Sequence, residues 1–109
     1  HIPRLERLDL SFNRIGPAGV RAVLDAGEAL TDVRFEVNQF GPEGAAAVAG
    51  SPAMARHLAL RLGRNGIGLA GARAVAESPY LGAVVEADLR ENRLGLRGVR
   101  ALASSVALR

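Results

Sequence analysis

The sequence predicts an α/β fold built as a solenoid, in which a short strand followed by a helix occurs about four times. The main observation is a repeated phrase: NRIGPAGVRAV begins at Asn13, and related stretches begin at Asn38, Asn65 and Asn92. Apolar residues alternate before each Asn, as in a strand, and take helical spacing after it. Self-similarity at a period of roughly 20–50 residues is typical of repeat architectures.

Length and composition favour one domain, 1–109, that has no membrane-spanning segment and no cysteine chemistry. The chain has 109 residues and no cysteine, which excludes disulfides, thiolate metal sites and cysteine catalysis. It contains no run of about 18 apolar residues and no recognisable signal peptide, so we expect no membrane association and a cytoplasmic location. All 14 basic residues are arginine, which is typical of a GC-rich genome and leads us to expect a bacterial source.

The strand half of each unit comes first along the chain. Leu8 and Leu10 alternate with polar residues, as in a half-buried strand, and the wider pattern reads L-x-x-L-x-L-x-x-N. His57 and Ala87 stand where the other units have larger aliphatic residues. We expect strands near residues 7–11, 32–36, 59–63 and 86–90.

The helical half follows each Asn. Gly19, Ala22, Val23 and Ala26 are spaced so that they share one helix face, and later units repeat this spacing. Proline suits the first helical position, and a Ser-Pro pair favours a helix end. We therefore expect helix starts at Pro17 and Pro42, and helix ends at Ser51-Pro52 and Ser78-Pro79.

The invariant Asn and Gly residues of the phrase have structural explanations. An Asn side chain carries donors and an acceptor, so each Asn is predicted to satisfy backbone groups where the strand turns. Substitution of Asn65, which has units on both sides, is expected to cost more stability than substitution of Asn92. The structural residues are therefore Asn13, Asn38, Asn65 and Asn92. Glycines suited to the tight turn into the helix are Gly16, Gly41, Gly68 and Gly95. Glycines expected to let helix and sheet backbones approach closely are Gly19, Gly44, Gly71 and Gly98.

These residues resemble the leucine-rich repeat family, and the NxxGxxGaxaL half is similar to its ribonuclease-inhibitor-type subclass. The resemblance covers nearly the whole chain. It implies a right-handed horseshoe with a parallel sheet on the concave face and helices on the convex face. The expected repeat units are 2–26, 27–53, 54–80 and 81–109.

The two ends of the chain lack a polar capping unit of the kind that normally closes a solenoid. Ile2 and Leu5 stand in core register at one end, and Val106 and Leu108 follow the last helix at the other. An unpaired strand edge can pair with another chain. We therefore expect a segment of a longer array, with self-association through its uncapped ends.

No group of residues predicts catalysis. His57 has no second ligand nearby, since His1 lies at the terminus, so we interpret it as a partly buried structural histidine. No Ser-His-Asp, paired-carboxylate or GxGxxG arrangement occurs, and the Gly-rich turns lack the lysine of a phosphate loop. We therefore predict that the chain is not an enzyme and uses no cofactor and no metal.

Charged residues occupy the strand positions that face away from the helices. The expected cross-strand neighbours, about 4.8 Å apart, are Arg7 with Asp32, Asp9 with Arg34, and Arg61 with Asp88. Two compatible interpretations stay open: a solvated face with cross-strand ion pairs, or a charged concave surface that binds a protein. The predicted partner-binding residues are Arg7, Asp9, Asp32, Arg34, Glu36, Arg61, Glu86, Asp88 and Arg90.

The last unit is rich in arginine, which raises the question of nucleic-acid binding. Arg90 is expected on the concave side, whereas Arg97 and Arg100 are expected on the helix side, so they form no single stripe. No aromatic residues lie between the arginines to stack on bases. The pattern, which also includes Arg93 and Arg109, therefore disfavours a nucleic-acid partner.

The leading hypothesis is a non-catalytic protein-interaction module that binds a partner protein on the concave face. Ribonuclease-inhibitor-type repeats also occur in the Ran GTPase-activating protein and in nucleotide-binding immune receptors. By that resemblance, the alternative is a regulatory or sensor segment of a larger protein, and an architectural spacer is a third possibility. The rest of the open reading frame discriminates between them, because a nucleotide-binding domain would be visible there.

Overall fold

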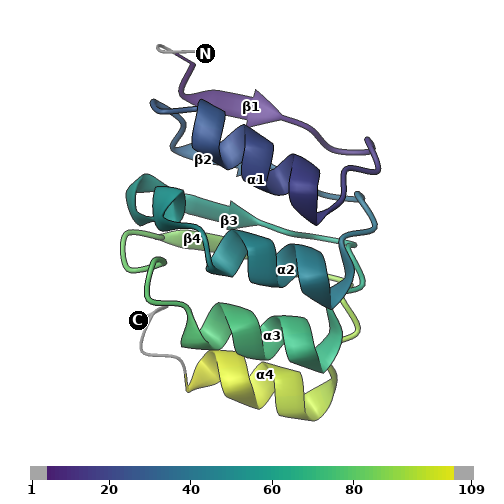
Figure 1. The fold of residues 1–109 in the computed structure, drawn as a ribbon. Helices are drawn as coiled ribbons and strands as arrows, with labels where there is room; N and C mark the ends of the chain where they lie inside the picture. The colour runs from purple at the N-terminus through teal and green to yellow at the C-terminus, as the bar shows by residue number, and fades with distance from the viewer. Residues whose placement is uncertain (1–4, 105–109) are drawn as a thin grey trace.

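The computed structural model describes residues 5–104 and places four short parallel strands in one sheet with four helices on one side of it. Figure 1 shows the helices stacked side by side in front of the sheet, in the same order as the strands β1-β2-β3-β4. Each strand is followed by a helix, so the predicted unit occurs four times. The elements are β1 (Arg7–Asp9), α1 (Pro17–Ala26), β2 (Asp32–Arg34), α2 (Gly41–Ala49), the 3-10 helix η1 (Pro52–Arg56), β3 (Ala59–Arg61), α3 (Gly68–Glu77), β4 (Glu86–Asp88) and α4 (Gly95–Ala103).

The strands are in the predicted places, but each ends two residues earlier than predicted because the backbone turns. Hydrogen bonds between units continue past the strand ends: Phe12 N donates to Glu36 O, and Val37 N donates to Gly63 O, both at 3.0 Å. Phe12 and Val37 have φ values of 66° and 58°. That left-handed conformation is incompatible with a strand, so the inter-unit hydrogen bonds extend further than the strands themselves.

The helix boundaries confirm most of the helix starts and ends that the sequence predicts. Proline begins α1 and occupies the second position of α2. Helices α2 and α3 end before the two Ser-Pro pairs, and the Ser78 hydroxyl donates to Ala49 O at 2.6 Å, which connects the ends of these helices. Ser51 caps the start of η1, where its hydroxyl accepts a bond from Ala53 N. The sequence analysis did not predict this 3-10 helix.

The four asparagines form the predicted hydrogen-bond ladder. In the last three, the side-chain oxygen accepts from the backbone N–H of the preceding Asn: Asn38 Oδ1 from Asn13 at 3.0 Å, Asn65 Oδ1 from Asn38 at 2.6 Å, and Asn92 Oδ1 from Asn65 at 2.8 Å. Each Nδ2 donates to carbonyls at the end of its own strand. Asn13 is exposed, and the other three are buried, so the ladder lies inside the solenoid.

The glycines that begin the helices behave as predicted in three of the four units. Gly41, Gly68 and Gly95 have φ values between 61° and 66°, which strain any residue with a Cβ. Gly16 differs, with an extended backbone at φ −91°. The first unit therefore turns into its helix without the left-handed residue.

The prediction that the second glycine of the unit lets helix and sheet backbones approach closely is wrong for Gly71 and Gly98. A Cβ on Gly71 would lie 2.5 Å from Ile67 Cβ and 3.2 Å from Ala45 Cβ in α2. Gly98 has the corresponding neighbours at the start of α4 and in α3. These glycines instead let each helix approach the apolar residue that begins its turn and the helix of the preceding unit.

The core lies between the sheet and the helices and is most complete in the two middle units. Val33 and Leu60 are buried, whereas Leu8 and Ala87, at the equivalent positions of the outer units, are at least partly exposed. The outer units have a described neighbour on one side only, which explains the difference. The expected core positions Ile2, Val106 and Leu108 lie outside the described residues.

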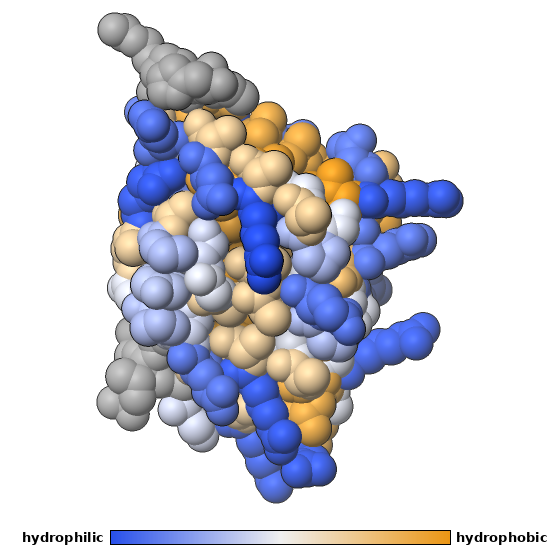
Figure 2. All heavy atoms as spheres, viewed as in Figure 1, coloured by the Kyte–Doolittle hydropathy of each residue, from blue (hydrophilic) through white to orange (hydrophobic). Residues whose placement is uncertain are grey.

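Figure 2 looks onto the helix side, where hydrophilic side chains lie among weakly hydrophobic ones. This is the composition of a surface helix whose apolar stripe faces inward. Between residues 5 and 104, no helix is both long enough and apolar enough to cross a membrane.

Candidate binding surface

The open face of the sheet, which is the face that the helices do not cover, carries the predicted partner-binding residues. The strand register is as predicted: Arg7 is beside Asp32, Asp9 beside Arg34, and Arg61 beside Asp88. The pairing of β2 with β3 also places Arg34 beside Arg61. Of the predicted partner-binding residues, those that line two adjoining depressions are Arg7, Asp9, Asp32, Arg34, Glu36, Arg61, Glu86 and Arg90. The remaining one, Asp88, bonds to Arg90.

Arg61 is the centre of a charge network across three strands. Its Nε and Nη2 donate to the two oxygens of Asp32 at 2.7 and 3.0 Å, and Nη2 also lies 3.2 Å from Glu86 Oε2. Hydrogen bonding by Arg61 holds the pKa of Asp32 below its usual value, and the same bonds raise the pKa of Arg61. The Arg61 side chain is only 15% exposed. This network therefore stiffens the open face as well as charging it.

Cross-strand ion pairs form on this face, but they join diagonal residues and not the directly facing ones of the predicted register. Arg61 bonds diagonally to Asp32 on β2, where its direct neighbour is another arginine, Arg34. It also bonds diagonally to Glu86 on β4, where its direct neighbour Asp88 is bonded to Arg90 instead. Within residues 5–104, neither Arg7 nor Arg34 has a carboxylate within 4.0 Å. Both side chains are exposed. The face therefore carries two guanidinium groups without a direct anionic partner.

Ser11 holds two carboxylates of the open face in place. Its backbone N–H donates to Asp9 Oδ1 at 3.0 Å, and its hydroxyl donates to Glu36 Oε2 at 2.8 Å. Hydrogen bonds from Ser11 hold the pKa of Asp9 below its usual value. Both carboxylates are thus oriented by Ser11 and not by the neighbouring Arg34.

At the other end of the face, Arg90 and Asp88 form a pair within one strand end. Arg90 Nε and Nη2 each lie 3.0 Å from an oxygen of Asp88. Burial alone would raise the pKa of Asp88, but hydrogen bonds from Arg90 outweigh it and lower that pKa. The same bonds raise the pKa of Arg90.

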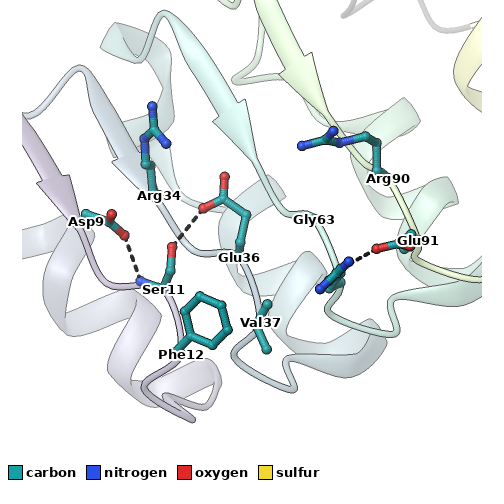
Figure 3. A pocket seen from close by; sticks show the side chains of 10 residues that line it. Asp9, Ser11, Phe12, Arg34, Glu36, Val37, Gly63, Arg90 and Glu91 are labelled. Atoms are coloured by element: carbon teal, nitrogen blue, oxygen red, sulfur yellow. Dashed lines mark hydrogen bonds and ion pairs between the residues drawn. The ribbon is translucent and has the colours of Figure 1, made fainter.

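The larger of the two depressions, here called the strand-end groove, has a volume of about 980 Å³ and lies where the strands end. Figure 3 shows the Phe12 and Val37 side chains next to each other on one side of it, below Ser11 and Glu36, with Gly63 between Glu36 and Arg90. Gly63 stands at the position that Ser11, Glu36 and Arg90 occupy in the other units. Because it has no side chain, it leaves space in the surface of the sheet. An ion pair between Arg64 and Glu91 completes the lining.

The repeat pattern did not predict four further surface residues of this face: Phe12, Val37, Arg64 and Glu91. Each follows the last open-face position of its unit and has positive φ, between 55° and 66°. The sequence did contain a signal, because Phe12 and Val37 directly precede the repeated Asn, at a turn position where small or polar residues are usual. The alternation of the strand gave no indication that a residue past its end contributes to the same surface.

His57 is more deeply buried than predicted, at 1% exposure, and its Nε2 has no hydrogen-bond partner. Burial and the nearby charge of Arg56 lower the pKa of His57 to about 4, although Asp32 acts in the opposite direction. No group of three or more potential metal ligands occurs in the described part of the chain. His57 is therefore a neutral core residue at neutral pH.

The arginines of the last unit are divided between the two sides of the molecule, as predicted. Arg90 lines the strand-end groove, whereas Arg97 and Arg100 lie in α4. Arg109 lies outside the described residues. These side chains therefore do not extend as one basic stripe along the surface.

Comparison with known proteins agrees with the architecture. A family model described as leucine-rich repeat matches residues 1–24 and 56–76, which fall in the first and third units. These matches support a leucine-rich repeat family, and the parallel sheet with four helices is consistent with a small leucine-rich-repeat solenoid of about four repeats. Domains of this class generally mediate protein–protein interaction and are generally not catalytic. A search of curated proteins found no match.

Proposed function

We propose that this chain is a non-catalytic protein-interaction module that binds a partner protein on its open face, the concave face of the solenoid. The observation that supports this is the free state of Arg7 and Arg34. On a face whose charges served only to pair with one another, these arginines would contact the carboxylates beside them. Charged groups left unpaired on a rigid sheet are instead available to a partner, where complementary charge favours fast and specific association.

We further propose the ribonuclease-inhibitor-type subclass. Each strand is followed by a full helix of nine or ten residues. A helix of this length behind every strand widens the convex side, and this widening supports curvature of the sheet toward the partner.

Charge reversal tests the face on which the partner binds. The chain serves as bait in an extract of its source cells, and captured proteins are compared between Arg7→Glu and Arg34→Glu on the open face and Arg21→Glu and Arg73→Glu on the helices. All four side chains are exposed, so the substitutions are matched in kind. We expect the open-face variants to lose a captured protein that both helix variants retain. Loss in the helix variants alone would place the site on the convex face and refute the proposal.

A further inference from the structure

Of the charged side chains that line the strand-end groove, one forms no hydrogen bond or ion pair with another described residue. Six charged residues line the groove, and within the described chain five of them make a hydrogen bond or an ion pair. The exception is Arg34, whose guanidinium contacts none of the neighbouring carboxylates. A guanidinium is a rigid set of donors that suits a carboxylate or phosphate. The chemistry that Arg34 offers in the groove is therefore that of a donor to an anionic oxygen acceptor.

The same groove has an apolar side that burial within the chain does not explain. The Phe12 side chain is 74% exposed, although it lies beside Val37. Both residues hold positive φ, and for a β-branched residue such as Val37 this conformation is a clear outlier. Asn or Gly would fit these two positions with less strain. The turn imposes positive φ at this position in all four units, and in the first two it carries a large apolar side chain at the groove surface.

We propose that the strand-end groove binds an acidic peptide segment of the partner, with a Glu or Asp side chain on Arg34 and a neighbouring apolar side chain on Phe12 and Val37. This inference rests on the proposed open-face function and names the chemistry of the partner. In an extended peptide, residues i and i+2 point to the same side and lie about 7 Å apart. A Glu and a Leu at that spacing therefore present their side chains to the same side, where the groove carries both Arg34 and the two apolar residues.

The charges around Arg34 favour a carboxylate over a phosphate. Asp9 and Glu36 flank Arg34 in the groove lining, and Ser11 orients both of their carboxylates. The pKa of Asp9 lies below its usual value, so this residue is ionised at neutral pH. A phosphorylated side chain carries roughly two negative charges, and two adjacent carboxylates repel it more strongly than they repel a singly charged acid. Of the two anions that suit a guanidinium, the carboxylate is therefore the one that this groove favours.

Peptide titration monitored by nuclear magnetic resonance tests the proposal with the chain as it is. The probe is Ac-Gly-Glu-Gly-Leu-Gly-NH2, and the comparison peptide carries Gln in place of Glu. We expect the Glu peptide to shift the Arg34 Nε–H and Phe12 amide signals, and the Gln peptide to bind about tenfold more weakly, as expected for loss of a charge-assisted contact. Equal binding of the two peptides, or no shift with the Glu peptide, would overturn the proposal.

Three variants locate the peptide in the groove. Arg34→Gln is expected to weaken the Glu peptide about tenfold and to bring it level with the Gln peptide. Phe12→Asn is expected to weaken both peptides while the chain stays folded, because Asn tolerates positive φ. Arg7→Gln is the matched control, since Arg7 is also unpaired on the open face but does not line the groove. An equal loss with Arg7→Gln would show that binding depends on general charge.

Two further results separate this proposal from the function on which it rests. Tighter binding of a phosphoserine peptide than of the Glu peptide would refute the carboxylate assignment. If Arg7→Glu releases a captured partner while the Glu and Gln peptides bind equally, the open face binds a protein and the groove assignment is wrong. If all open-face variants retain the partner, the proposed function itself is wrong.

Discussion

Replacing Asn65 with Ala isolates the contribution of one step of the Asn ladder. Asn65 is buried and has units on both sides. Its Oδ1 accepts from Asn38 N, and its Nδ2 donates to the carbonyls of Phe35, Leu62 and Gly63. The substitution removes all four bonds without changing the backbone.

The four lost bonds do not cost the same free energy. Each of the three carbonyls retains another donor: Asn38 Nδ2 for Phe35 O, Asn92 Nδ2 for Leu62 O, and Val37 N for Gly63 O. Asn38 N has no such replacement, and Asn38 is 1% exposed, so its N–H is left buried and unsatisfied. An orphaned buried donor costs about 1–3 kcal/mol. We therefore expect Asn65→Ala to lower the free energy of unfolding by about 2 kcal/mol.

Urea unfolding followed by far-ultraviolet circular dichroism measures this loss, with Asn13→Ala as the matched control. Asn13 occupies the same repeat position but is exposed, and no described N–H depends on its side-chain oxygen. We expect the control to lose less than about 0.5 kcal/mol. Asn92 Oδ1 accepts from both Asn65 N and Ile67 N, so its loss should be at least as large as that of Asn65, not smaller as the sequence suggested. Equal, small losses at Asn13 and Asn65 would refute the ladder argument.

Three further substitutions test the core, the charge network and the helix packing. The pKa of His57 is lowered from 6.5 to about 4, so the unfolded chain binds the proton more tightly than the folded chain does. The free energy of unfolding should therefore fall by about 3 kcal/mol as the pH falls from about 6.5 to about 4. In urea titrations at several pH values, His57→Leu should remove this part of the pH dependence. Arg61→Gln should lower the free energy of unfolding by about 1 kcal/mol, and by less at high salt. Unfolding measured at about 0.1 and about 1 M NaCl tests this salt dependence. Gly71→Ala should cost about 1–3 kcal/mol because its Cβ meets buried Ile67, whereas Gly19→Ala, with one neighbour at 3.2 Å, should be close to neutral in thermal melts.

The fold was predictable from the sequence because the same pattern of strand alternation, Asn and helical spacing occurs four times. Alternation before Asn38 and helical spacing after it identify the elements, and the ladder follows from what an Asn side chain donates and accepts. The 3-10 helix η1 was not predictable, since its only signal, Ser51-Pro52, also marks a helix end. The role of Gly71 was misassigned because a one-dimensional pattern does not show which surface a helix approaches most closely.

The candidate binding surface was predictable in its positions but not in its contacts. Strand register determines which residues lie side by side, whereas ion pairing depends on side-chain reach and on like-charge neighbours. Arg61 therefore bonds diagonally to Asp32, because Arg34 lies directly beside it on β2. Phe12 was missed because it lies past the strand end, where the backbone turn returns its side chain to the same surface.

The solenoid separates the atoms that hold the fold from those that face a partner, and Arg61 is the exception that determines how binding should be probed. The ladder uses Asn side chains and backbone groups, so most open-face side chains can differ between units without disturbing it. Arg61 is largely buried and bonds to two other strands, so its reversal would place a carboxylate beside Asp32 and Glu86 and weaken the fold and the surface together. Arg34 makes none of these contacts. A change in binding caused by Arg34 can therefore be assigned to recognition, whereas the same change caused by Arg61 cannot.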